Sequence, residues 1–146
     1  MELGDFFQVP VNYFAVLLCG ISSMIIGFFW YGPLFGKEWM KLIGLTTEKQ
    51  EKAKKSMRQN YTAMFIASLV MAWILFHFIW YAAPGSYTLF ISIKIAIYAW
   101  IGFIATVSFV KFLFSPEKKS LKLLFIETGY HLVSLIVMGI IFYAFK

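Results

Sequence analysis

Four long apolar runs, at residues 11–31, 61–83, 87–110 and 121–145, dominate this sequence. A bilayer core about 30 Å thick is crossed by about 20 apolar residues in a helix, and each run is at least that long. The runs are continuously apolar and do not alternate with polar residues, so they predict helices and not the strands of a membrane barrel. We therefore expect an all-α integral membrane protein with four transmembrane helices in a single domain, residues 1–146.

The composition excludes a water-soluble domain. Hydrophobic residues make up 61% of the chain and charged residues only 14%, against about 25% charged residues in ordinary soluble proteins. A chain of 146 residues cannot bury so much apolar surface in its own core. The single Cys19 excludes a disulfide framework. Because acidic residues, Glu2 and Asp5, precede the first run, we expect that run to stay in the mature protein and not to be a cleaved signal.

The distribution of basic residues predicts the orientation. Most of the 13 lysines and arginines lie in two segments, 32–60 and 111–122, which four spans place on the same side of the membrane. The positive-inside rule puts that side in the cytoplasm, with the basic loop 32–60, and puts both termini outside. The net charge of +6 is then a feature of juxtamembrane segments. We expect membrane lipids, including anionic ones, as partners, and no nucleic acid.

The loop after the first run carries local structure. Gly32-Pro33 is predicted to end the first helix, and the spacing of Phe35, Trp39 and Leu42 predicts a short amphipathic helix lying in the cytoplasmic membrane interface and ending near Gly44.

A second helix is expected to begin at the end of this loop and to continue into the second run. Thr47 followed by Gln50 fits a capping box. Glu48 with Lys52, and Glu51 with Lys55, are favourable pairs one turn apart on that helix. The second span should therefore begin as a cytoplasmic arm near Glu48.

One string in this region resembles a known family. Residues 27–40, with the motif Trp30, Tyr31, Gly32, Pro33, Phe35, Gly36 and Trp39, are similar to the hallmark of the domain of unknown function 1761 family of small four-span prokaryotic membrane proteins. Segments 100–103, 129–133 and 138–139 resemble the same family in the same order. The resemblance covers nearly the whole chain. It implies a four-helix membrane fold in a prokaryotic cytoplasmic (inner) membrane, and it implies no activity.

Ionisable side chains inside the spans are the candidate functional residues, because each is costly in a bilayer. Glu127 and His131 are one helical turn apart near mid-bilayer, and Ser134 extends their face. The two can form a structural pair, relay a proton or ion, or supply two of several metal ligands. Secondary candidates are Lys94, which can reach the headgroups, Tyr98, and His77, which we expect at the outer interface.

Three classes of function remain open. The first is an oligomeric transporter or channel-like subunit that uses Glu127 and His131. The second is a non-catalytic lipid-binding or accessory protein, and the third is a membrane enzyme acting on a lipid or quinone. No catalytic, cofactor or complete metal motif occurs, so we expect no cofactor and no resident metal. Small residues at helical spacing serve either packing within the chain or a homo-oligomer: Gly20, Ser23 and Gly27, and Ala99, Gly102 and Thr106.

Overall fold

The computed structural model describes residues 8–117 and 119–146, and within these ranges it contains helices and no strand. In chain order the elements are α2 (Tyr13–Phe29), η1 (Trp30–Leu34), α3 (Gly36–Leu42), α4 (Thr47–Ala82), α5 (Leu89–Ala99), η2 (Trp100–Ala105), α6 (Thr106–Leu113) and α7 (Leu121–Ala144). The elements η1 and η2 are short π-helical turns. They continue α2 and join α5 to α6.

Four helices are long and apolar enough to cross a membrane: Tyr13–Leu34, Thr47–Ala82, Leu89–Leu113 and Leu121–Ala144. The predicted four-span helical fold is thereby confirmed, and these helices suggest a membrane protein. The position of α3 relative to a membrane surface stays a prediction. The second helix has 36 residues, about 54 Å at 1.5 Å per residue, so it is longer than a bilayer core.

Each long helix begins at a residue whose side chain caps the free backbone N–H groups of the first turn. The cap of α2 is Asn12, whose side chain accepts a hydrogen bond from the Ala15 N–H at 3.2 Å. Equivalent oxygens cap the other three helices, from Thr46, Thr88 and Ser120. Hydroxyl and amide side chains at the ends of apolar runs therefore set where the helices begin.

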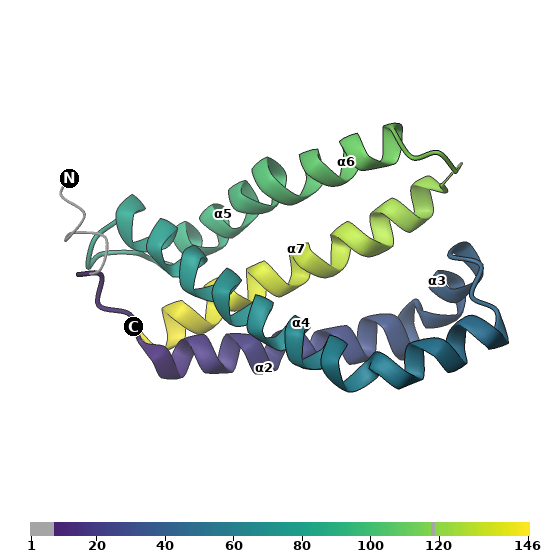
Figure 1. The fold of residues 1–146 in the computed structure, drawn as a ribbon. Coiled ribbons are helices and arrows are strands. Elements are labelled where there is room, and N and C mark those ends of the chain that lie inside the picture. The colour runs from purple at the N-terminus through teal and green to yellow at the C-terminus, as the bar shows by residue number, and fades with distance from the viewer. Residues whose placement is uncertain (1–7, 118) are drawn as a thin grey trace.

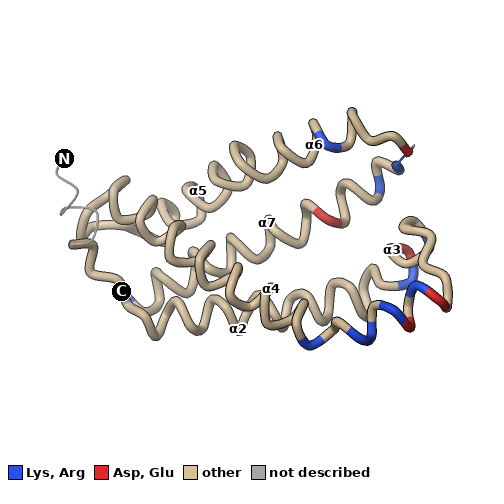
Figure 2. The backbone as a smooth tube through the Cα atoms, viewed as in Figure 1, with Lys and Arg blue, Asp and Glu red and all other residues tan. Residues whose placement is uncertain are grey.

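The helices run back and forth, so the start of α2 and the end of α7 lie at the same end of the molecule (Figure 1). We call this the terminal end; it includes Asn12, Tyr87 and Phe145. The opposite end, with α3 and Lys119, is the basic end. Most lysines and arginines of the described residues gather there, on the first half of α4 and beside the α6–α7 connection (Figure 2).

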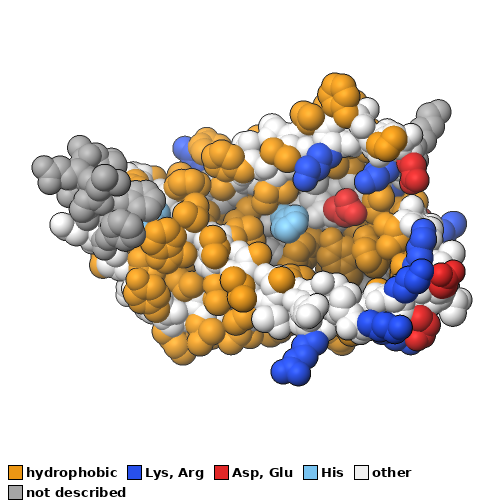
Figure 3. All heavy atoms as spheres, viewed as in Figure 1, with side chains coloured by type: hydrophobic (Ala, Val, Ile, Leu, Met, Phe, Trp, Pro, Cys, Tyr) orange, Lys and Arg blue, Asp and Glu red, His pale blue; other side chains and the backbone are white. Residues whose placement is uncertain are grey.

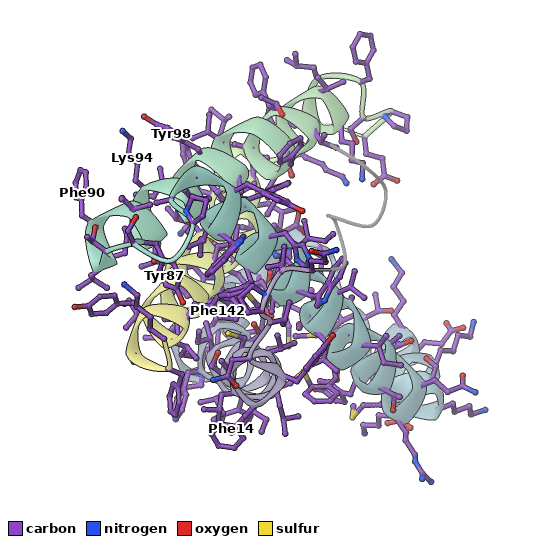
Figure 4. The ribbon with its side chains drawn as sticks, turned by 90° about the vertical axis from the view of Figure 1, so that its left-hand side faces the viewer. Phe14, Tyr87, Phe90, Lys94, Tyr98 and Phe142 are labelled. Carbon is purple, nitrogen blue, oxygen red and sulfur yellow. The ribbon has the colours of Figure 1, made fainter. Side chains whose placement is uncertain are left out.

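The hydrophobic core lies toward the terminal end. Its fully buried side chains include Ala15, Cys19, Ala72, Ile79, Ala96 and Met138. Hydrogen bonds close this end: Asn12 Nδ2 donates to the Phe145 carbonyl at 3.0 Å, and Lys146 Nζ donates to the Tyr87 carbonyl at 2.9 Å. Figure 4 looks onto this end, where the Tyr87 hydroxyl also donates to the Phe142 carbonyl at 3.4 Å.

The packing loosens toward the basic end. No residue of α6 is buried, and α6 diverges from α4 in Figure 1. An ion pair at 3.0 Å between Lys122 Nζ and Glu38 Oε1 ties α3 to α7. The helices are therefore packed more tightly toward the terminal end than toward the basic end.

The prediction that Gly32-Pro33 ends the first helix was wrong. The helix continues through η1, which contains Pro33, and ends at Phe35, whose φ is −121°. Phe35 N–H donates to the Trp30 carbonyl five residues back, at 2.9 Å. A proline lacks the N–H of a normal helical bond, and the wider π turn accommodates this loss.

The predicted arm before the second span is confirmed, with two corrections. The helix α4 is continuous from Thr47, but its cap is Thr46, whose hydroxyl accepts from the Lys49 N–H at 3.4 Å. The Glu48–Lys52 pair forms at 2.9 Å. Glu51 pairs with Lys54 at 2.8 Å instead of the expected Lys55, because a residue three positions along also faces it on a helix.

Candidate functional site

Two cavities open at the basic end and share a wall of Tyr31, Trp39 and His131. The first, which we call the polar cavity, has a volume of about 340 Å³ and is lined by these three with Ser108, Lys111, Phe112, Lys119, Leu123, Leu124 and Glu127. The second, the aromatic cavity, has a volume of about 630 Å³ and is lined by the same three with Met24, Gly27, Phe28, Tyr61, Met64 and Tyr130. Both volumes are typical of small-molecule sites.

Glu127 and His131 both line the polar cavity from α7. In Figure 3, acidic, histidine and basic side chains surround a hollow on this face. Glu127 is exposed, and His131 is half-buried. Within residues 8–117 and 119–146, His131 Nδ1 is buried without a hydrogen-bond partner. No hydrogen bond or ion pair joins Glu127 to His131 in the same ranges. Glu127 and His131 therefore line the same cavity but are not bonded to each other. Ser134, the third candidate, is fully buried in the bundle.

Two tryptophans hold the turn of α7 that carries Glu127. Trp30 Nε1, from η1, donates to the Ile126 carbonyl at 2.9 Å. Trp100 Nε1, from η2, donates to the Thr128 carbonyl at 2.8 Å. A carbonyl oxygen has two lone pairs, so it can accept an indole N–H beside its helical bond. The two accepting carbonyls flank Glu127, so elements from two other spans hold the backbone of the turn that carries it.

The motif after the first apolar run builds the shared wall. A Cβ on Gly36 would lie 2.5 Å from the Tyr31 carbonyl oxygen, so only glycine permits this close turn. The turn places the Trp39 ring 5.2 Å from that of Tyr31, which also lies 5.5 Å from Tyr130. Phe35 packs on Trp30 at 4.7 Å. Gly32 and Pro33 are exposed.

The charges of the polar cavity come from three segments. Lys111 lies on α6, Lys119 precedes α7, and Glu127 is on α7. Lys122 is engaged elsewhere, since its ammonium hydrogen-bonds Glu38 and holds the pKa of that carboxyl below its usual range. Tyr31 lies close enough to Glu127 to interact electrostatically with it. Two lysines thus face one carboxylate.

The secondary candidates lie outside the polar cavity. Lys94 and Tyr98 project from the outer face of α5 (Figure 4), with Lys94 Nζ 5.5 Å from the centre of the Tyr98 ring. His77 is only 2% exposed and packs on Trp73, with ring centres 3.9 Å apart and Nδ1 2.8 Å from the Trp73 carbonyl oxygen. The structure therefore buries His77 among the helices.

The stripes of small residues have different surroundings. A Cβ on Gly20 would lie 2.6 Å from Leu69, so that stripe packs α2 against α4. A Cβ on Gly102 would meet nothing within 4 Å. Gly102 and Thr106 are therefore exposed, whereas Ala99, at the start of that stripe, packs against the core.

No set of three or more His, Cys, Asp or Glu side chains within the described ranges is placed to hold a metal ion. Cys19 lies in the terminal-end core, with Sγ 3.9 Å from the Met138 carbonyl oxygen. The third ligand that a site at Glu127 and His131 requires is thus not supplied by these residues.

The chain was compared with known proteins. No curated protein and no solved structure matches it. A family model described as a protein of unknown function, DUF1761, matches residues 14–143. The match covers all four apolar helices and the cavity-lining motif, and it confirms the resemblance found in the sequence. The chain therefore belongs to the DUF1761 family.

Proposed function

We propose that this protein is the subunit of a small membrane transporter, with the polar cavity as its binding site and Glu127 as its proton-carrying group. The observation that carries the proposal is the one-sided cavity. It lies at the basic end, and the hydrophobic core lies between it and the terminal end. A transporter exposes a central site to one side of the membrane at a time, and this arrangement has the form of one such state.

The chemistry of the cavity wall supports this proposal. An acidic side chain within an apolar helix is costly, and such groups commonly mark proton or ion pathways. Glu127 is exposed to the cavity and free of ion pairs within the described residues, so it can exchange a proton with water or a ligand there. His131, on the same wall, is a second side chain that can carry a proton.

The proposal includes a homo-oligomer, because four helices of this length enclose little volume. The exposed small residues Gly102 and Thr106 support a contact between two copies through the third span. Gly102→Cys should form a disulfide-linked dimer in membranes, whereas Phe90→Cys, at a residue 75% exposed on α5, should not. Equal cross-linking of both variants would count against this interface.

We propose a prokaryotic cytoplasmic membrane as the location, with both termini outside and the basic end in the cytoplasm. The clustering of lysines and arginines at the basic end supports this orientation. The cavity then lies in the cytoplasmic half of the bundle.

The transport proposal is tested with purified protein in vesicles that contain a pH-sensitive dye. A pH gradient is imposed, and ethidium or hexyl phosphate is added as a cationic or anionic probe. We expect one probe to drive proton movement through the parent protein. Glu127→Gln should reduce this flux at least tenfold, since an amide cannot carry the proton. Glu48→Gln, which alters an exposed carboxylate on the cytoplasmic arm, is the matched control and should retain the flux.

Thermal stability in detergent separates the relay from a structural pair. Because Glu127 has no bond to His131 within the described residues, Glu127→Gln and Glu127→Leu should both stay as stable as the parent. A loss of about 1 to 3 kcal/mol in Glu127→Leu alone would indicate a structural pair. A parent that moves no protons with either probe, or a Glu127→Gln variant that keeps the parent's flux, would refute the transport proposal.

A second candidate is a lipid-binding or accessory protein without transport. It is favoured by the exposed basic face of the first half of α4, which carries Lys49, Lys55 and Arg58. Such a face attracts anionic headgroups at about 1 kcal/mol per basic residue near the surface. Copurification of phosphatidylglycerol with the detergent-solubilised parent, lost in the triple variant Lys49→Gln/Lys55→Gln/Arg58→Gln, would support this role if proton flux is absent.

A further inference from the structure

We propose that the two cavities form one binding site for an amphiphilic organic anion, whose charged head lies in the polar cavity and whose apolar body lies in the aromatic cavity. This inference rests on the proposed function, because it names the class of substrate that the transporter takes. It starts from the shared wall: Tyr31, Trp39 and His131 line both cavities. A ligand that passes this wall would contact two environments of different polarity.

The charge of the polar cavity favours an anion. Lys111 and Lys119 reach it from two segments, while Glu127 is the one carboxylate among the described residues that line it. Lys122 does not add to this charge, since its ammonium is paired with Glu38. The cavity is positive when Glu127 is ionised and more so when it is protonated. An ammonium head would meet two like charges for one opposite charge, which disfavours a cationic ligand.

The lining of the aromatic cavity favours an apolar body. Met24 and Met64 contribute flexible thioether side chains, which adapt to varied apolar shapes. Phe28, Tyr61 and Tyr130 add aromatic surface. Gly27 keeps the space open, because a Cβ there would lie 3.1 Å from Met64 Cε. At about 630 Å³, the cavity is far larger than an inorganic anion requires.

The boundary between the cavities offers a polar atom for orientation. Within the described residues, His131 Nδ1 is buried and has no hydrogen-bond partner. A buried polar atom without a partner is costly, so a ligand oxygen at the shared wall would favour a rotation of the His131 ring that exposes Nδ1 to it. Trp39 and Tyr31 complete this wall with aromatic rings 5.2 Å apart.

Proton and anion binding should strengthen each other. Protonation of Glu127 removes the negative charge that opposes an anionic head, so each ligand raises the affinity for the other by the same factor. The charged or titratable groups that face Glu127 are Lys111 from α6, Lys119 before α7, Tyr31 from η1, and His131 on its own helix. This positive coupling is what a transporter that carries a proton and an anion together needs.

The inference is tested by calorimetric titration of the intact protein in phosphatidylcholine nanodiscs. The probes are hexyl phosphate, inorganic phosphate and hexyltrimethylammonium. Hexyl phosphate should bind saturably, and affinity in an alkyl phosphate series should rise about fourfold per buried methylene until the cavity is full. Lys111→Gln/Lys119→Gln should weaken hexyl phosphate binding at least tenfold. Lys49→Gln/Lys55→Gln, which removes the same charge from the exposed α4 arm, should stay within twofold of the parent.

Separate variants test the contacts of the ligand's apolar body and the coupling between proton binding and anion binding. Phe28→Ala and Met64→Ala should reduce the gain per methylene, since each removes apolar lining from the aromatic cavity. The parent should bind hexyl phosphate more tightly as the pH falls, and Glu127→Gln should lose most of this dependence. Inorganic phosphate binding as tightly as hexyl phosphate would overturn the inference. So would tighter binding of hexyltrimethylammonium, or an equal loss in the two lysine double variants.

The source of the anion is decided with nanodiscs that contain phosphatidylglycerol. If a lipid supplies the head, phosphatidylglycerol displaces hexyl phosphate from the parent and copurifies with it, but not with Lys111→Gln/Lys119→Gln. If a free amphiphile is the ligand, the titration is unchanged by phosphatidylglycerol. Both results support an amphiphilic anion. Proton flux driven by ethidium without hexyl phosphate binding would refute this inference alone, whereas binding without any proton flux would refute transport alone.

Discussion

The close approach of α5 and α7 can be tested at Gly139. A Cβ at this position would lie 3.0 Å from the Ser92 carbonyl oxygen and 3.2 Å from its carbonyl carbon. Ordinary van der Waals contacts of a Cβ begin at 3.4 Å. Both neighbouring atoms belong to the backbone of α5, so no side chain can rotate away. Gly139→Ala must therefore shift one helix against the other by a few tenths of an ångström.

The cost can be estimated by comparison with a second glycine. Overpacking a tight interface costs about 1 to 3 kcal/mol, while alanine gains about 1 kcal/mol over glycine in a helix. Gly102→Ala has the same gain but no clash, because a Cβ at residue 102 would have no neighbouring atom within 4 Å. The helix-propensity gain of alanine over glycine cancels when the unfolding free energies of the two variants are subtracted. We expect Gly139→Ala to be less stable than Gly102→Ala by about 1 to 3 kcal/mol.

The free energy of unfolding of both variants is measured in detergent, with circular dichroism as the readout. The protein concentration is chosen so that both variants stay monomeric. Monomeric conditions matter because Gly102 belongs to the proposed contact between copies. Equal stability of Gly139→Ala and Gly102→Ala would refute the close helix approach, and with it the tight closure of the terminal end.

Three further outcomes follow from the structure and the charge pattern. Cysteine at Ser56 should react with impermeant reagents only from the cytoplasm and cysteine at Ser86 only from outside; labelling of Ser56→Cys from outside would overturn the orientation. Trp39→Asp should lower membrane yield far more than Lys37→Ala, because Trp39 packs on Tyr31 while Lys37 is exposed; equal yields would contradict an interfacial α3. Trp30→Phe should cost about 0.6 kcal/mol in unfolding free energy for the lost indole hydrogen bond, and an unchanged value would argue against that bond.

The sequence predicts the four spans because each depends only on local composition. Twenty apolar residues in a row have no other stable arrangement in a bilayer, whatever their tertiary contacts. The arm before Tyr61 was also predictable, since Glu48 and Lys52 are neighbours on a helix through spacing alone. The capping residue of this helix was harder to predict, because Thr46 and Thr47 are adjacent and either hydroxyl could cap the first turn.

The candidate site was predictable in part. Glu127 and His131 stand out because ionisable residues in a span are rare, and the cavity brings both to one wall. Their neighbours Lys111 and Trp39 come from distant parts of the chain. Local sequence patterns do not indicate that such distant residues line the same cavity. His77 is buried against Trp73 instead of lying in an exposed position, which depends on how α4 packs and not on its own composition.

The tryptophan hydrogen bonds show that two Trp-x-Gly motifs, Trp30-Tyr31-Gly32 and Trp100-Ile101-Gly102, have the same structural form. Trp30 and Trp100 each open a π-helical turn, and each indole donates to a carbonyl beside Glu127. A π turn adds a residue to the helix, so it changes which face the following side chains present. The two π turns come from different spans, yet their indoles bind consecutive parts of one turn of α7. The position of both turns next to the residue that carries the carboxylate therefore follows from the two hydrogen bonds.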